Sequence, residues 1–276
     1  MKSLQECITE AEKKGVAIGH FNISDSEGFK AVAEAAKQLL VPVIIGVSEG
    51  EREFIGLKEV AALVQVARES GMEIFLNADH HYSVEKAKQA IDAGVDSVII
   101  DAADKTLEEN IAVTQEIVQY AGGRALVEGE VGFIGKSSKI LEEVPEGISK
   151  TSPDEAELFV KSTGIDLLAP AVGNVHGIIK TGEPKLDIEL IRAIREKVRV
   201  PLVLHGASGN SDEDLKAAIK AGVSIIHINT ELRLAYKEGI EEGIKSGEVA
   251  PYKFMKEAVE NMKEVVVKKL KLFNNL

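Results

Sequence analysis

The chain has 276 residues, of which 45% are apolar, and a formal net charge of −12 at pH 7. That length suits one domain over residues 1–276, since a single α/β barrel commonly needs about 250 residues. The negative charge, with no cluster of basic and aromatic residues to offset it, argues against nucleic acid as a partner. No apolar run approaches the ~20 residues that cross a bilayer, so no membrane partner is expected.

The N-terminus and the cysteine content favour a cytoplasmic protein. Residues 1–10 are polar and partly acidic, unlike the apolar segment of a secretory signal. Cys7 is the one cysteine in the sequence, so no internal disulfide can form, as is typical of a reducing compartment.

Segments rich in valine and isoleucine alternate along the chain with longer amphipathic segments, which is the pattern of repeated βα units. Eight segments are predicted to be strands: 16–21, 43–47, 73–78, 97–101, 125–130, 166–169, 202–205 and 224–229. Helices are predicted between them, except around 132–152, and a last helix over 252–272 should pack outside the barrel or at a subunit interface. The fold class is therefore α/β, a single (β/α)8 TIM barrel with an extra C-terminal helix. The long connection 132–152 is expected to close over a substrate.

Three histidines lie where predicted strands end: His80, His176 and His205. The carboxyl ends of parallel strands surround one mouth of a barrel, and three imidazoles are an accepted ligand set for catalytic zinc. An isolated histidine is more often a hydrogen-bonded core or surface residue. Three of them at strand ends, beside glycine, asparagine and aspartate, favour a metal site.

Acidic residues accompany these histidines. Asp79 precedes His80, and their side chains point to opposite sides of an extended strand unless the chain turns there. The alternative role of Asp79 is to cap the helix that starts near Ser83. Glu128 and Glu130 alternate, so both can project into the mouth and serve a metal or a metal-bound histidine; the alternative is a frayed strand in solvent.

A glycine-rich turn follows the seventh predicted strand. Gly206, Ala207 and Ser208 come directly before a helix, where free backbone N–H groups can hold a phosphate. An ordinary loop, with Ser211 as the helix cap, is the alternative.

The last predicted strand carries polar residues at its end. His227, Asn229 and Glu231 alternate and share one face if the strand stays extended. The alternative is a strand end followed by a helix that Asn229 or Thr230 caps.

Several separate motifs follow one another along the chain: His20-Phe-Asn22, Ser48, Ala78-Asp-His80, Asp92-Ala-Gly-Val-Asp-Ser-Val-Ile-Ile-Asp101, Val127-Glu-Gly-Glu130, Gly173-Asn-Val-His-Gly177 with Lys180, and His205-Gly-Ala-Ser-Gly209. Together, over most of the length, they resemble the class II, metal-dependent fructose-bisphosphate aldolase family, which includes tagatose-bisphosphate aldolases.

The resemblance implies a site and a reaction. His80, His176 and His205 would ligate Zn²⁺ or another divalent metal, with Glu130 beside them, and Asp79 would be the acid and base at the C4 hydroxyl of the substrate. The implied substrate- and phosphate-binding residues are Asn22, Ser48, Gly177, Lys180, Gly206, Ala207, Ser208, Asn229 and Thr230. The implied reaction is reversible cleavage of fructose 1,6-bisphosphate to dihydroxyacetone phosphate and glyceraldehyde 3-phosphate, by a cytoplasmic homodimer or homotetramer.

The chain departs from the family pattern at several positions. The loop after the fifth predicted strand lacks the expected proton-transferring glutamate, and Glu142 and Glu143 are the candidates to replace it. His227 stands where the family has an asparagine that stabilises the enediolate, and a neutral imidazole can also donate a hydrogen bond. Ile225 replaces a usual lysine, and His81 replaces a small residue.

These departures leave two alternatives open. The chain could act on tagatose 1,6-bisphosphate or another phosphorylated ketose, or it could be a non-catalytic aldolase-like subunit that keeps the barrel and the metal for stability. The intact histidines and Asp79 oppose the second alternative, whereas the missing loop glutamate supports it.

Overall fold

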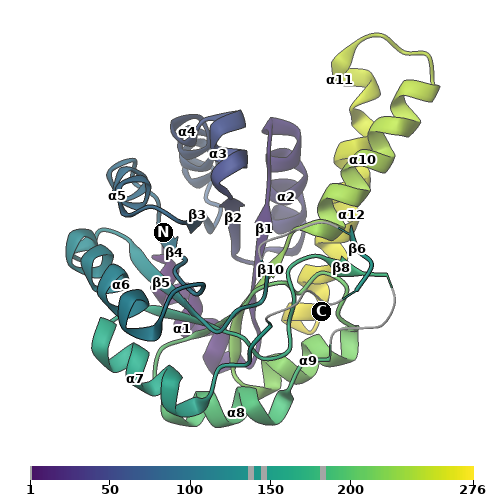
Figure 1. Cartoon of the computed structure of the whole chain (residues 1–276). Helices are drawn as coiled ribbons and strands as arrows, with labels where there is room; N and C mark the ends of the chain where they lie inside the picture. The colour runs from purple at the N-terminus through teal and green to yellow at the C-terminus, as the bar shows by residue number, and fades with distance from the viewer. Residues whose placement is uncertain (1, 136–139, 144–147, 181–184) are drawn as a thin grey trace.

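Eight parallel strands close into a barrel in the computed structural model of the chain (Figure 1), which describes residues 2–135, 140–143, 148–180 and 185–276. Around the barrel the strands follow the order β1, β10, β9, β7, β5, β4, β3, β2. Their bounds are β1 Ile18–Asn22, β2 Val43–Val47, β3 Ile74–His81, β4 Ser97–Ile100, β5 Leu126–Val131, β7 Leu167–Pro170, β9 Leu202–Leu204 and β10 Val223–Ile228. The predicted (β/α)8 barrel is confirmed.

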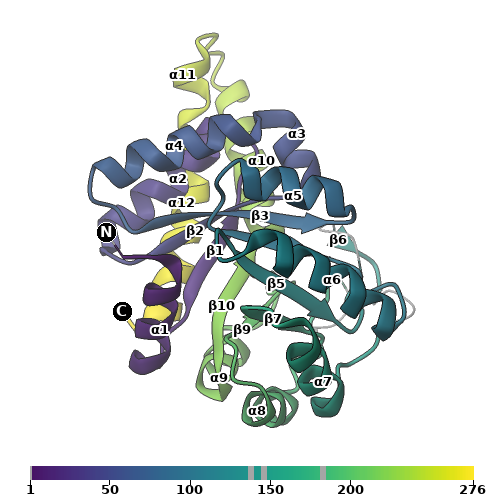
Figure 2. The same cartoon turned by 90° about the vertical axis from the view of Figure 1, so that its left-hand side faces the viewer.

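Helices surround this barrel (Figure 2). Their bounds are α1 Leu4–Lys14, α2 Ser26–Leu39, α3 Glu49–Ile55, α4 Leu57–Glu69, α5 Val84–Asp92, α6 Leu107–Ala121, α7 Pro153–Thr163, α8 Ile188–Lys197, α9 Asp212–Ala221, α10 Thr230–Lys245, α11 Pro251–Phe254 and α12 Lys256–Asn274. Several begin with a capping box, in which a serine or threonine and a glutamate three residues later satisfy each other's backbone N–H groups, as Thr106 and Glu109 do for α6. None of the described helices has the length and apolar character needed to span a bilayer.

Helix α1 contributes to a core inside the barrel. Its side chains Leu4, Cys7 and Ile8 belong to one buried cluster with strand residues such as Ile44 and Phe75. Burial raises the pKa of the Cys7 thiol to about 12, so this cysteine is a neutral apolar group of the core. The packed interior is a solid base for the opposite end of the barrel.

The structure adds details that the sequence did not predict. Strand β3 runs through His81 rather than ending at 78, and a short parallel pair, β6 Ile140–Leu141 and β8 Ile178–Ile179, lies outside the barrel. The predicted lid includes 136–139 and 144–147, which lie outside the described residues, and its closure stays a prediction.

The helix predicted over 252–272 is divided in the structure: α11 ends at Phe254, and after Met255 the long C-terminal helix α12 begins at Lys256. Helices α10, α11 and α12 form a hairpin that projects from the barrel (Figure 1). The barrel end of α12 packs against α2 and β1, which confirms its predicted place outside the barrel.

The close crossing of α10 and α12 depends on glycine. A Cβ at Gly239 would lie 2.5 Å from the backbone N and Cα of Ala258, whereas a Cβ at Gly50, in α3, would meet no atom within 4 Å. We expect Gly239→Ala to lower the free energy of unfolding by about 1–3 kcal/mol through overpacking. Gly50→Ala is the control and should raise it by up to about 1 kcal/mol through helix propensity. Urea denaturation measures the free energy of unfolding of both variants. Equal effects would mean that the crossing of α10 and α12 does not require glycine at position 239.

Candidate functional site

A cavity of about 520 Å³ opens at the carboxyl ends of the barrel strands. Its lining comes from β1, β3, β10, the start of α10 and the loops after β2, β3, β7 and β9. It includes Asn22, Ser48, Asp79, His80, Tyr82, His176, Gly177, Gly206, Ser208, His227, Asn229, Thr230 and Arg233. This is the end at which barrel enzymes place their active sites. Most of the residues proposed from the sequence therefore meet in one cavity.

Four donor groups converge on one point at the base of the cavity. His80, Glu130, His176 and His205 each place one ligand atom within 4.8 Å of the other three. Zinc–nitrogen bonds are about 2.0–2.1 Å long, so small side-chain shifts would bring these atoms to coordination distance. Glu130 Oε2 and His205 Nδ1 are buried, 3.6 Å apart, and hydrogen-bond to no described group. The residues present therefore fit a metal ion.

The backbone at His80 explains how neighbouring residues reach the same cavity. His80 has a φ of +48°, in the left-handed region, and the pairing of β3 with β4 shifts register between Ala78 and His81. Such a conformation costs about 1–3 kcal/mol and persists only where the surroundings impose it. Here the Arg52 guanidinium donates hydrogen bonds to the carbonyls of Asp79 (2.8 Å) and His80 (3.1 Å). The chain turns, so both side chains line the cavity.

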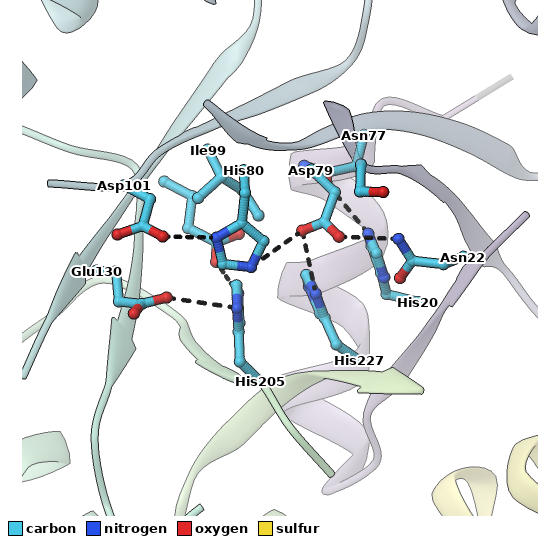
Figure 3. Close-up of polar contacts among 12 residues, drawn as sticks. His20, Asn22, Asn77, Asp79, His80, Ile99, Asp101, Glu130, His205 and His227 are labelled. Atoms are coloured by element: carbon cyan, nitrogen blue, oxygen red, sulfur yellow. Dashed lines mark hydrogen bonds and ion pairs between the residues drawn. The ribbon is translucent and has the colours of Figure 1, made fainter. Parts of the chain in front are cut away.

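Carboxylates fix the orientation of two of the imidazoles. His80 Nδ1 lies 3.0 Å from Asp101 Oδ2 (Figure 3). His205 Nε2 lies 2.6 Å from Glu128 Oε1. An ionised carboxylate accepts, so each of these nitrogens donates to its partner when that partner is ionised. His80 Nε2 and His205 Nδ1 are then the ring nitrogens that face a metal, and at His80 the metal would take the place of the second proton of the imidazolium. Such partners orient metal ligands and raise their basicity.

The acidic groups make this region favourable for a cation. Burial opposes a positive charge on His80, yet Asp79 and Asp101 outweigh it and raise the pKa of His80 to about 10. Burial raises the pKa of Glu128 to about 8 and also raises the pKa of Glu130. Buried carboxyl groups this close together can all ionise only if a cation compensates them.

The other two imidazoles are neutral. Burial, reinforced by the charge on His80, lowers the pKa values of His176 and His205 to about 3. Neutral imidazole is the form that binds a metal.

Asp79 lies beside this group as an ionised carboxylate. Its Oδ2 accepts a hydrogen bond of 2.8 Å from Asn22 Nδ2, and its Oδ1 lies 3.7 Å from His80 Nε2 and 3.8 Å from His227 Nδ1 (Figure 3). Burial raises its pKa, but the nearby His80 and His20 outweigh that effect, so the pKa lies below its ordinary value. Asp79 does not cap α5, since Ser83 accepts from that helix.

A stack of imidazole rings holds His227. The ring centroids of His20 and His227 are 3.5 Å apart with planes 3° apart, and His227 lies 4.1 Å from His205 on its other side. His20 Nε2 is 3.1 Å from Asn77 Oδ1, and Asn77 Nδ2 donates to Ser97 Oγ at 2.7 Å. The orientation of His227 is therefore set from both faces.

The predicted phosphate-binding residues form one wall of the cavity. Gly206, Ser208, Asn229 and Thr230 line it, and Ala207 is buried next to them. Ser208 Oγ accepts the backbone N–H of Asn229 at 3.2 Å, which joins the loop after β9 to the start of α10. Asn229 is the N-cap residue of α10, without a side-chain cap bond.

Three predicted residues lie elsewhere. Lys180 Nζ pairs with Glu142 Oε1 at 2.5 Å beside the β6–β8 pair, and Glu142, Glu143 and Lys180 are exposed and absent from the cavity lining.

Several residues with contacts in the site were not predicted. Glu51 Oε2 accepts from Asn22 Nδ2 at 2.9 Å, and its Oε1 accepts from Arg233 at 2.6 Å. The capping box formed by Ser48 and Glu51 was visible in the sequence. Nothing local in the sequence marks Arg52 as the partner of two carbonyls in β3.

Gly46 leaves the space that the His20 ring occupies. A Cβ at position 46 would lie 2.1 Å from His20 Cε1. We expect Gly46→Ala to displace His20 and, through the stack, His227, and to lower turnover by about 10-fold or more, as small misplacements do in active sites. Steady-state kinetics provide the measurement, and Asp92→Asn, at an exposed position of α5 outside the cavity lining, is the control. Wild-type turnover in Gly46→Ala would mean that the stack has no effect on the reaction.

Comparisons with known proteins agree with this geometry. The family model described as "Fructose-bisphosphate aldolase class-II" matches residues 2–276. The chain is 41% identical over 245 residues to a fructose-bisphosphate aldolase of Geobacillus stearothermophilus, covering 87% of this chain and 84% of that protein. It is 37% identical over 278 residues to one of Staphylococcus aureus strain Mu50, covering 98% and 96%.

A solved structure gives the same result. The crystal structure of the YdjI aldolase from Escherichia coli K12 superposes with a TM-score of 0.85 at 32% identity, covering 99% of this chain and 97% of that one. This chain is therefore an enzyme, a carbon–carbon lyase that belongs to the class II fructose-bisphosphate aldolase family.

Proposed function

We propose that the protein is a zinc-dependent aldolase that cleaves fructose 1,6-bisphosphate to dihydroxyacetone phosphate and glyceraldehyde 3-phosphate, and catalyses the reverse condensation. The observation that carries the proposal is the placement of the Asp79 carboxylate beside four convergent metal-ligand candidates in one cavity.

His80, His176 and His205 would hold the metal, with Glu130 as a further or alternating ligand. Three imidazoles with an open position suit zinc, although other divalent metals accept the same donors. When bound, the metal would act as a Lewis acid that stabilises the charge formed on cleavage, by several kcal/mol. Asp101 and Glu128 would keep the ligand tautomers fixed.

Asp79 would take the proton of the substrate's C4 hydroxyl. As the C3–C4 bond breaks, C4 becomes the aldehyde carbon, and the bonding electron pair passes to C3 and then to the C2 oxygen as an enediolate. Because Asp79 is ionised and its Oδ1 has no hydrogen-bond partner among the described groups, it can accept this proton. In condensation it returns the proton to the C4 oxygen.

His227 would donate a hydrogen bond to the enediolate. Burial lowers its pKa, so the ring is neutral and keeps one N–H to donate. The stack between His20 and His205 holds the ring before the reaction, which reduces reorganisation.

The proton that reaches C3 would come from the loop after β5. Glu142 and Glu143 are the candidate donors, and both would have to move into the cavity from their exposed positions. For Glu142 this includes breaking its pair with Lys180.

The phosphate nearer the ketone would bind at the wall formed by Gly177, Gly206, Ala207, Ser208, Asn229 and Thr230. Backbone N–H groups at the start of α10 favour an anion there. Asn22, at the end of β1, and Ser48, after β2, line the cavity and would contact the sugar. Lys180 would bind the second phosphate after leaving its exposed pair with Glu142.

A stereoisomer such as tagatose 1,6-bisphosphate is the second candidate substrate. His227, in place of the family's asparagine, and His81 change side chains in or behind the cavity.

We also propose a cytoplasmic homodimer or homotetramer. The exposed apolar residues Ile244, Val249 and Tyr252 on the projecting hairpin support an oligomer.

The first test is a coupled assay for triose phosphate release from fructose and tagatose 1,6-bisphosphates. Turnover should disappear when a chelator removes the metal and return with Zn²⁺, since the metal stabilises the developing charge. Faster turnover of the tagatose isomer would change the substrate assignment. Metal-loaded protein that cleaves neither isomer would leave another phosphorylated ketose or the non-catalytic role.

The second test replaces the proposed base. Asp79→Asn keeps the size of the side chain but cannot accept the proton, so kcat should fall by about 10²–10⁴-fold. Asp92→Asn is the control, because Asp92 is an exposed residue of α5 that pairs with Arg124. Bound metal, measured by elemental analysis, should be the same in both variants. A kcat near wild type for Asp79→Asn would remove Asp79 from the mechanism.

A further inference from the structure

Helix α12 carries a buried lysine that the proposed reaction does not use. Of the lysines and arginines in the described part of the chain, Lys269 alone is buried, with 3% of its surface exposed. Burying an ammonium group is costly unless it is paired. The location of the acidic group that pairs with Lys269 therefore indicates which part of the structure the lysine serves.

That partner lies at the phosphate wall. Lys269 Nζ is 3.0 Å from Glu231 Oε1, and the same oxygen accepts the backbone N–H of Gly209 at 3.0 Å. Glu231 is in the first turn of α10, and its own N–H points to Ser208 Oγ at 3.5 Å. One carboxylate thus connects α12, the start of α10 and the loop after β9.

The charges of this arrangement matter for an anion. Glu231 is next to Thr230 and bonded to Gly209, so its negative charge lies beside the wall proposed to receive a phosphate. Like charges in a partly buried site repel strongly because water screens them little. A cation that touches the carboxylate cancels most of that repulsion while leaving the hydrogen bond to Gly209 intact.

We propose that Lys269 and Glu231 form a positioning pair for phosphate binding, in which Glu231 holds the loop after β9 in place through Gly209 and Lys269 neutralises Glu231. The inference rests on the proposed function, because it assumes that the wall binds a phosphate group. Lys269 itself touches no substrate; it acts through Glu231 from the C-terminal helix.

The pair makes a sharper prediction than a structural ion pair would. If the role is charge balance, removing the lysine alone leaves a negative charge beside the phosphate, whereas removing both charges restores neutrality. Gln at position 231 can still accept the Gly209 N–H through its amide oxygen. A pair that served stability alone would affect unfolding without a selective effect on phosphate.

The experiment measures the affinity of metal-loaded protein for inorganic phosphate by calorimetry, together with KM and kcat. The variants are Lys269→Met, the double variant Lys269→Met/Glu231→Gln, and the control Lys268→Met, whose lysine is exposed and lies 3.9 Å from Asp212. We expect Lys269→Met to weaken phosphate binding by about 10-fold, or about 1.4 kcal/mol, and to raise KM more than it lowers kcat. The control should bind as the wild type does, and the double variant should recover most of the loss.

Two outcomes would overturn the inference while leaving the proposed function intact: unchanged phosphate affinity in Lys269→Met, or a double variant that binds as weakly as the single one. If Lys269→Met does not fold, the double variant alone is measured. It should bind inorganic phosphate with near wild-type affinity, and a loss of affinity of about 10-fold would contradict charge balance. A wild-type enzyme that cleaves the sugar bisphosphate but binds no phosphate at this wall would overturn the inference only. No cleavage and no phosphate binding by the wild type would overturn both.

Discussion

The left-handed backbone of His80 is the constraint on which the site depends. In a regular strand, consecutive side chains point to opposite faces, so Asp79 and His80 could not both reach the barrel mouth. The positive φ at His80, braced by Arg52 on the carbonyls of both residues, removes that restriction. A metal-ligand candidate and a candidate proton acceptor can then lie side by side. The hydrogen bonds from Arg52 offset the free energy that the left-handed conformation of His80 costs.

The remaining groups depend on burial and mutual support. Carboxylates orient His80 and His205, and stacking orients His227; the buried carboxyl groups lie so close together that they can all ionise only with a compensating positive charge. A rigid base is needed for such an arrangement, because a polar network that is only partly satisfied is unstable. The packed cluster beneath, to which α1 contributes, supplies it.

The barrel could be predicted from the sequence because its strands are short runs of valine and isoleucine between amphipathic helices. The meeting of His80, His176 and His205 followed from the same argument, since parallel strands end around one mouth. What escaped prediction depends on contacts distant in sequence: the brace from Arg52, the stacking of His20 on His227, and the pairing of His80 with Asp101. The β6–β8 pair has strands of two residues each, too short for a periodic signal.

The proposed phosphate wall has few free cationic side chains near it. Arg233, the one arginine among the described lining residues of the cavity, is paired with Glu51, and Arg52, on α3, is bonded to carbonyls of β2 and β3. In a chain with a net charge of −12, the proposed attraction for the phosphate at this wall would come mainly from backbone N–H groups at helix starts and from a bound metal ion. Such a site gains its affinity from fixed local dipoles, so the geometry of the loops that carry them decides its strength. By the same reasoning, the proposed role of Lys269 lets the distant helix α12 influence binding through the loop after β9.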